Sequence, residues 1–210
     1  MPITCVTEAI AITKDVVLTI AAAVGIYVAV RGLNTWNRQL KGGVEYELTR
    51  RLLKCTYRLR EAIKSVRNYI IQPNEQPSPP DDEARAMTLD QQRYYGLSKA
   101  YQNRWDKVVQ VRNDLQTELL EAEVIWGKEI HDRFEPLFKL QQELFADIHS
   151  YLVVCNPAEH QQTRDAMAEI RRKRREVLYD ISDLEPDKYS EEVALAITAI
   201  ETHLKPHLKK

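Results

Sequence analysis

The sequence predicts an all-α protein in which a single N-terminal transmembrane helix precedes an elongated antiparallel helical bundle, a coiled-coil-like cytoplasmic domain. Three observations support this prediction. The chain of 210 residues contains only 6 Gly and 9 Pro, which are too few turn-forming residues for a protein of many strands. An uncharged apolar run lies near the N-terminus. Elsewhere, apolar residues recur at the helical spacings of three and four.

The apolar run near the N-terminus predicts the membrane helix. It extends from Val16 to Val30 and would be about 22 Å long as a helix, whereas a bilayer core is about 30 Å thick. A buried soluble helix and a cleaved signal peptide are therefore alternatives. The flanks favour a span, because residues 9–13 add apolar length. Residues typical of a membrane interface also follow the run: Arg31, Trp36, Arg38 and Lys41.

Charge on the two sides of the run predicts its orientation. Residues 1–15 carry one basic side chain and residues 31–50 carry four. The positive-inside rule then places the N-terminus outside the cell membrane and the C-terminal domain in the cytoplasm. A signal peptide is disfavoured because Glu8 and Asp15 outnumber the single lysine before the run. We expect a short extracytoplasmic tail at 1–15 and a single transmembrane helix at 16–32.

A stripe of small residues follows one side of this helix. Ala21, Gly25 and Ala29 recur every four residues, the spacing at which two membrane helices can approach closely. We expect helix–helix contact at these residues, which would make the protein a homo-oligomer. The alternative is that the stripe reflects only the high frequency of Ala and Gly in membrane helices.

A basic helix at 33–72 and a Pro-rich loop at 73–88 are expected next. Prolines are absent between Pro2 and Pro73 and then occur four times within eight residues. Gly42 and Gly43 are either a hinge or a tolerated pair inside one helix. The apolar residues of the helix alternate spacings of four and three, which indicates a bundle seam: Leu48, Leu52, Cys55, Leu59, Ala62, Val66 and Tyr69.

A long helical segment is expected at 89–156. Its first part has a second seam, formed by Tyr101, Trp105, Val108, Arg112, Leu115, Leu119, Ala122 and Trp126. Gly127 and Pro136 leave two alternatives, a kinked continuous helix or a helical hairpin. We favour the kinked helix because no loop-forming cluster separates the two halves.

Two short C-terminal helices are expected within 157–210. The first is basic, covers 163–179, and has its inner face at Met167, Ile170, Val177 and Leu178. The second is amphipathic and is expected to start with Ser190 as its N-cap and to end before Pro206. Its apolar positions are Val193, Ile197, Ile200 and Leu204.

The charges of two segments are complementary. Residues 31–72 contain ten basic and three acidic side chains, a net charge of +7, and residues 73–159 contain nine basic and sixteen acidic side chains, a net charge of −7. Opposite charge favours antiparallel docking of the helices in these segments. Each exposed pair adds at most about 1 kcal/mol, so apolar packing must supply most of the stability.

No motif for catalysis, cofactor binding or metal binding is recognisable, so we expect neither an enzyme nor a bound cofactor or metal. The chain has no P-loop, nucleophile elbow, zinc-protease motif or dinucleotide fingerprint. His131 with Glu135 and His203 with His207 have metal-ligand spacing, but surface ion pairing is the simpler interpretation of the first and Pro206 interrupts the second. The three cysteines are solitary and are interpreted as ordinary thiols: Cys5, Cys55 and Cys155.

Two clusters of cations are candidate contacts for anionic lipid. On a helix, consecutive residues spread around the axis, so solvation or pairing with acidic residues is the alternative, and nucleic acid is the less favoured ligand. A cluster of tyrosines and Trp105 at the start of the long segment is interpreted as core packing. The candidate lipid contacts are Arg38, Lys41, Arg50, Arg51, Lys54, Arg171, Arg172, Lys173, Arg174 and Arg175.

These features predict a membrane-anchored scaffold, adaptor or subunit of a membrane-associated assembly, which acts through a protein partner that the sequence does not identify. The alternative is a membrane-perturbing effector, of the toxin or defence type, that oligomerises through its anchor. The second alternative is an enzyme whose site has no recognisable motif.

Overall fold

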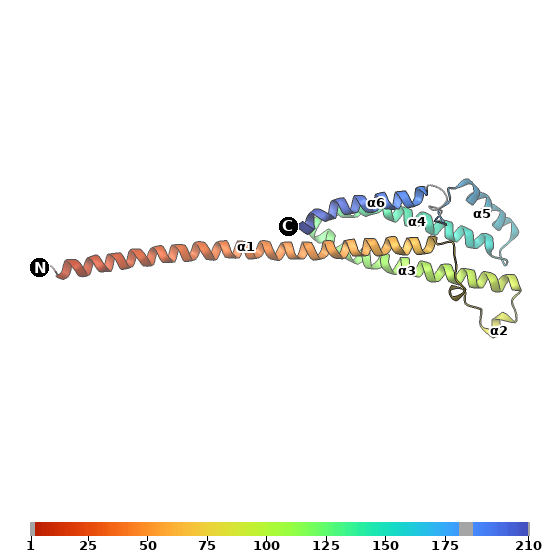
Figure 1. Cartoon of the computed structure of the whole chain (residues 1–210), viewed down its shortest axis with the longest axis horizontal. Coiled ribbons are helices and arrows are strands. Elements are labelled where there is room, and N and C mark those ends of the chain that lie inside the picture. The colour runs from red at the N-terminus through yellow and green to blue at the C-terminus, as the bar shows by residue number, and fades with distance from the viewer. Residues whose placement is uncertain (1–2, 181–186, 210) are drawn as a thin grey trace. The chain divides into compact units, whose positions relative to one another are not determined.

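The fold of the described residues is entirely helical, as predicted. The computed structural model describes the backbone of residues 3–180 and 187–209, and in this part of the chain there is no strand. Within the first helix it describes side chains from Leu18 onward, except at positions 19, 34 and 37. The elements shown in Figure 1 are α1 (Ile3–Arg67), η1 (Pro73–Glu75), α2 (Asp81–Ala84), α3 (Leu89–Trp126), α4 (Glu129–Cys155), α5 (Gln161–Lys173), α6 (Lys188–Leu204) and η2 (Lys205–Lys209).

The described residues form two units, and the boundary lies within α1. We call the part up to Glu47 the N-terminal unit and Leu48–Lys209 the bundle unit. Helical structure continues through residues 3–15, 16–32 and 33–47, so the expected tail is helical from Ile3. Gly42 and Gly43 also lie within α1 and do not break it.

The expected transmembrane helix at 16–32 gains no support from the described residues. Among them, no helix contains a stretch that is both long and apolar enough to span a bilayer. The side chains of Val16, Val17 and Thr19, which belong to the expected span, lie outside the described residues, as do those of Lys14 and Asp15.

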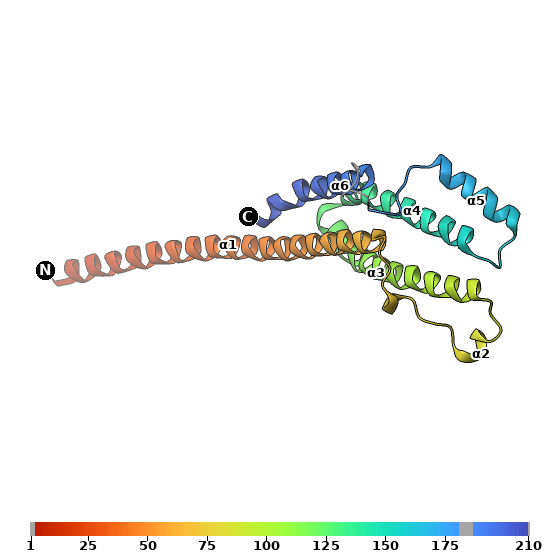
Figure 2. The same ribbon diagram turned by 45° about the vertical axis from the view of Figure 1, so that its right-hand side comes forward.

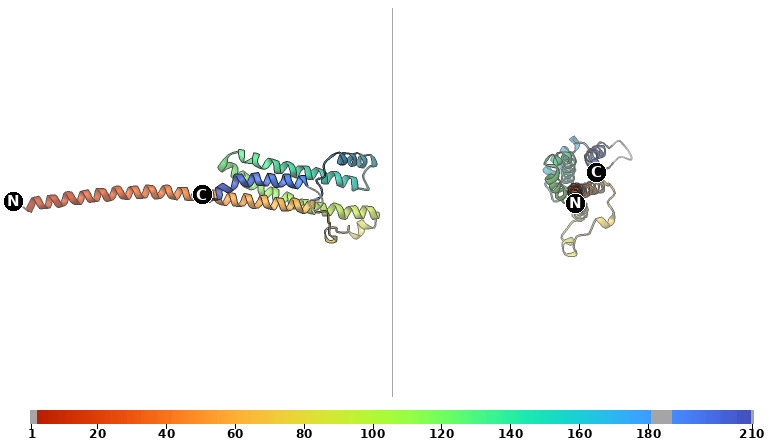
Figure 3. Two further views of the ribbon diagram at one scale, coloured as in Figure 1. Left: turned by 45° about the horizontal axis from the view of Figure 1, so that its top comes forward. Right: turned by 90° about the vertical axis from the view of Figure 1, so that its left-hand side faces the viewer.

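The bundle unit is an up-down-up-down arrangement of four helices: residues 48–67 of α1, then α3, α4 and α6. α3 runs antiparallel to α1, α4 returns antiparallel to α3, and α6 lies beside both α4 and α1 (Figures 2 and 3). Short α5 packs on α4. The apolar stripes of the four helices meet in one core, because each helix has a buried side and a solvated side.

The expected seams form this core with few exceptions. In α1, Leu48, Leu52 and Leu59 have no exposed surface, and Tyr69 is exposed because it lies beyond the helix. α3 begins as expected at Leu89, where the Thr88 side chain caps the helix. The buried seam residues of α3 and α6 include Tyr101, Val108, Leu115, Leu119, Val193, Ile197, Ile200 and Leu204. α4 adds Ile130, Phe134, Leu137 and Leu144 to the same core.

α1 ends at Arg67, five residues before the expected boundary at 72, because a buried arginine takes the carbonyl oxygens that follow. Arg104 of α3 donates from Nη1 to the Asn68 carbonyl (2.6 Å) and from Nη2 to the Ile70 carbonyl (2.7 Å). Its guanidinium also binds the Glu75 carboxylate of η1. The expected loop at 73–88 therefore contains two short helices, η1 and α2, and its first turn is fastened to α3.

The kinked helix that we favoured for 89–156 is wrong, because the chain forms a hairpin of α3 and α4. α3 ends at Trp126, and Gly127 adopts φ +85° and ψ 176°. This conformation is essentially restricted to glycine, and it turns the chain within two residues. Pro136 lies inside α4 and does not end it.

The two C-terminal helices also differ in detail from expectation. α5 ends at Lys173 rather than at 179, and Val177 and Leu178 are buried in the segment after it. The expected inner face of the helix itself is wrong at Ile170, which is exposed. α6 begins at Lys188, and its N-cap is Asp187 rather than Ser190. The Asp187 carboxylate accepts a hydrogen bond from the Ser190 backbone amide (3.3 Å).

Candidate functional site

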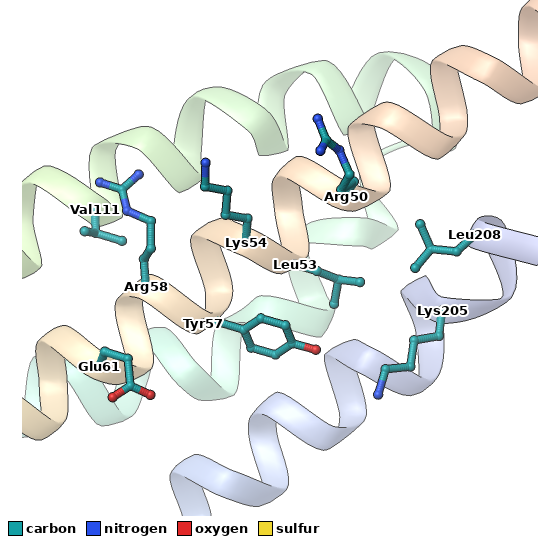
Figure 4. A pocket seen from close by; sticks show the side chains of 9 residues that line it. All are labelled: Arg50, Leu53, Lys54, Tyr57, Arg58, Glu61, Val111, Lys205 and Leu208. Carbon is teal, nitrogen blue, oxygen red and sulfur yellow. The ribbon is translucent and has the colours of Figure 1, made fainter.

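The candidate site is an open groove of about 690 Å³ in the bundle unit, where apolar and charged side chains of three elements meet. It follows the outward side of α1, with α3 on one side and the end of α6 with η2 on the other (Figure 4). We call it the α1 groove. Its lining residues are Arg50, Leu53, Lys54, Tyr57, Arg58, Glu61, Val111, Lys205 and Leu208.

Apolar side chains from three elements form the floor of the α1 groove. Leu53 and Val111 belong to the core and are almost fully buried, so they expose only a small apolar surface to the groove. Tyr57 and Leu208 are partly buried and extend the apolar surface towards η2 (Figure 4). The Tyr57 hydroxyl donates to Glu201 of α6 (2.7 Å). Burial and this hydrogen bond raise the pKa of Tyr57.

Cations outnumber carboxylates around the groove by four to one. Arg50, Lys54 and Arg58 recur every four residues of α1, so they follow one edge with a rise of about 6 Å between neighbours. Lys205 stands on the opposite side, from η2, and Glu61 lies at the far end.

Some of these cations already have acidic partners within the bundle. Arg58 lies 2.9 Å from Asp114 of α3, with both side chains well exposed. Lys205 pairs with Glu201, and this pairing is the main reason that the pKa of Glu201 is lowered. Lys54 makes no ion pair with any described residue. Exposed ion pairs of this kind are weak, so Arg58 and Lys205 can exchange partners at little cost.

The predicted complementarity of basic α1 and acidic α3 is present in the structure. Arg51 donates from Nε to Glu118 (2.7 Å) and also pairs with Glu121, and these contacts raise its pKa. Together with Arg58 and Asp114, they place opposite charges along the antiparallel contact between α1 and α3. Arg51, one of the candidate lipid contacts, is therefore already paired with carboxylates of α3.

Three of the five consecutive cations at 171–175 are also engaged with other residues of their own unit. Arg171 donates to the Asp147 carbonyl (2.9 Å) and lies over the ring of Tyr151. Lys173 pairs with Glu169 along α5. Arg175 binds both Glu143 and Glu192, which raises its pKa. Arg172 and Arg174 are exposed.

In the N-terminal unit, the stripe of Ala21, Gly25 and Ala29 is exposed, and a Cβ added at Gly25 would meet no atom within 4 Å. Arg31 donates to the Tyr27 hydroxyl (2.7 Å) one turn away. The remaining candidate lipid contacts of this unit, Arg38 and Lys41, are exposed and line a hollow beside Gly42 and Gly43.

Among residues with described side chains, no group of His, Cys, Asp and Glu is arranged to hold a metal ion. His131 lies 3.0 Å from Glu123 rather than next to a cluster of carboxylates. Cys55 is buried, which raises its thiol pKa, and Cys155 is partly buried. Cys5 lies outside the residues whose side chains are described.

Comparison with protein-family models, curated proteins and solved structures finds no match to this chain. The sequence marked Arg50 and Lys54 of the α1 groove, but neither its other two cations nor its floor. The spacing of Leu53 and Tyr57 beside Arg50, Lys54 and Arg58 was a usable signal, whereas nothing in the sequence placed Lys205 and Leu208 next to α1.

Proposed function

We propose that this protein is a single-pass membrane-anchored scaffold, or a subunit of a membrane-associated assembly, that binds a protein partner through its helical bundle. The proposal of a membrane anchor is supported by the exposure of apolar side chains around α1 in the N-terminal unit. Side chains that are more than half exposed there include Leu18, Ile20, Val24, Ile26, Val28, Val30 and Leu33. A helix that is apolar on all sides requires an apolar environment, which a bilayer provides.

The residues after the apolar part support the same proposal. Trp36 is 63% exposed, and Arg38 and Lys41 are exposed beyond it. This is the order of aromatic and basic residues at a membrane interface on the cytoplasmic side. The N-terminus then lies outside the membrane, and the bundle unit lies in the cytoplasm.

A pair of substitutions on the same helix tests the anchor. Val24→Lys places a charge in the centre of the proposed span, which costs about 3 kcal/mol in membrane insertion. Val44→Lys makes the same change at an exposed valine of the same unit outside the span. The wild type and Val44→Lys should remain in the membrane pellet after alkaline carbonate extraction, and Val24→Lys should be released more readily. Release of the wild type would refute the anchor.

Orientation is tested with a thiol reagent that does not cross membranes. In intact cells, or in spheroplasts where an outer membrane is present, it should label Cys5. Cys155, which is partly buried in the bundle unit, should react only after permeabilisation. Labelling of Cys155 and not Cys5 in intact cells would reverse the proposed orientation.

A further inference from the structure

We infer that the α1 groove binds an amphipathic helix of a partner protein, in which carboxylates recur beside an apolar stripe. This inference rests on the proposed scaffold function and deepens it by naming the site and the chemistry of the partner. Helix-in-groove binding of this kind uses an apolar floor for affinity and flanking charges for orientation.

The floor of the groove suits an apolar stripe. Tyr57 and Leu208 expose apolar surface between α1 and η2, next to the core residue Leu53. Val111 of α3 adds apolar surface beside Arg58 (Figure 4). The groove is open along α1 rather than closed around its contents (Figure 4). An elongated element can therefore lie in it, whereas most small-ligand sites enclose the greater part of their ligand.

The charges of the groove repeat with the rise of a helix. Arg50, Lys54 and Arg58 are separated by one turn each, so a helix laid along α1 meets them with carboxylates at every fourth residue. Lys205 attracts acidic side chains on the opposite flank. Glu61, at the end of the groove beyond Arg58, disfavours carboxylates there and so fixes the register of the partner.

The bundle itself already contains an interaction of this type. On the neighbouring side of α1, the acidic helix α3 packs antiparallel and presents Asp114, Glu118 and Glu121 to Arg58 and Arg51. The groove offers an adjacent face of α1 with the same kind of cations, among them Lys54, which has no ion pair with any described residue. A second acidic helix completes this face in the way that α3 completes the first. A lipid headgroup carries its charge in one compact group, whereas a helix presents carboxylates at the spacing of Arg50, Lys54 and Arg58.

The test uses the purified full-length chain and a fluorescently labelled synthetic helical peptide with a leucine stripe flanked by glutamates at every fourth position. The comparison peptide has lysine in place of each glutamate. Fluorescence anisotropy should show saturable binding of the glutamate peptide, weakened by added salt. Lys54→Glu should weaken this binding by about tenfold or more, because a charge facing the peptide is reversed. The same variant should strengthen binding of the lysine peptide.

Lys64→Glu is the matched control. Lys64 is exposed on the same helix, does not line the groove and makes no ion pair with any described residue, so this variant should bind the glutamate peptide within about twofold of the wild type. Circular dichroism should show equal helicity for both variants, since both positions are exposed.

Three outcomes would overturn the inference. The first is no saturable binding of the glutamate peptide, or equal binding by the wild type and Lys54→Glu. The second is displacement of the peptide by phosphatidylserine vesicles but not by phosphatidylcholine vesicles, which would assign the groove to anionic lipid. The third is a dimer of the wild type in analytical ultracentrifugation that the glutamate peptide dissociates and that Lys54→Glu does not form, which would assign the groove to a second copy. None of these outcomes changes the carbonate extraction of Val24→Lys, so failure of the inference is distinguishable from failure of the anchor.

Discussion

Arg67 and Asp187 form an ion pair of 2.8 Å in which their side chains are only 2% and 4% exposed. The same guanidinium donates to the carbonyl oxygens of Val177 and Tyr179 and to the Ser190 hydroxyl, and it lies over the ring of Tyr189. Each of the three guanidinium nitrogens of Arg67 thus has a polar partner, so the protein stabilises the buried charge. This pair joins the C-terminal end of α1 to the N-terminal end of α6.

Asp187→Ala should therefore destabilise the bundle strongly. It removes the counterion of a buried arginine and the N-cap of α6, and loss of one partner of a buried pair costs about 3–5 kcal/mol. Urea unfolding followed by circular dichroism measures the change. Asp90→Ala is the control, because Asp90 lies in the first turn of α3 and its pair with Arg93 is exposed, so its loss should cost less than about 1 kcal/mol. A cost for Asp187→Ala no greater than that of the control would contradict the caged pair.

Stability should fall in acid partly through Glu75. Its hydrogen bonds from Arg104 are the main cause that lowers its pKa from 4.5 to about 2. Because the pKa is lower in the folded state, this contribution is complete above about pH 4.5 and is lost as the pH falls towards 2. Glu75→Gln should unfold more easily than the wild type at pH 7, and the difference should shrink at pH 2.5. A difference that is equal at both pH values would show that Glu75 acts through packing alone.

Gly127→Ala should destabilise the hairpin by about 1–3 kcal/mol. A Cβ at φ +85° is strained, although no atom lies within 4 Å of it, so the cost comes from the backbone alone. Gly42→Ala is a contrasting substitution, because Gly42 is inside α1 with open space around it and alanine favours a helix by about 1 kcal/mol. The melting temperature of Gly127→Ala should therefore fall, whereas that of Gly42→Ala should rise or stay unchanged. An unchanged melting temperature for Gly127→Ala would contradict the turn geometry.

Gly25→Leu separates the scaffold from the membrane-perturbing effector. Leucine suits a bilayer but keeps two backbones apart along the stripe of Ala21, Gly25 and Ala29. If the stripe mediates self-association, crosslinking between copies in membranes should decrease in Gly25→Leu and persist in Val24→Leu. A scaffold causes no dye leakage from liposomes in any of these forms. Leakage by the wild type that disappears in Gly25→Leu would favour the effector.

The seams were predictable because local spacing alone determines which side of a helix is apolar. Leu48, Leu52 and Leu59 are buried where their three-and-four spacing placed them. Arg67 was not predictable in this way. In the sequence it resembles the other cations of α1, but its partners are contributed by residues more than 100 positions away, and only their convergence makes burial of the charge tolerable.

The ends of helices were harder to predict than their faces for a related reason. Gly127 and Pro136 were both candidate breaks, and the sequence gives no backbone angle that would distinguish them. The expected extension of α1 to 72 failed because a side chain of α3, Arg104, competes for the carbonyl oxygens of Asn68 and Ile70. The α1 groove was only partly predictable from the sequence. Three of its four cations share α1, but Lys205 and Leu208 depend on the placement of η2.

The order of the helices along the chain has a consequence for synthesis. The side of α1 that α6 covers is made first, and α6 follows its end by about 120 residues. At a translation rate of about 5–20 residues per second, roughly 6–24 s pass before α6 leaves the ribosome. Throughout that interval α1 can pair only with α3 and α4. Closing of the bundle by α6, and with it the formation of the groove between α1 and η2, therefore follows the pairing of α1 with α3.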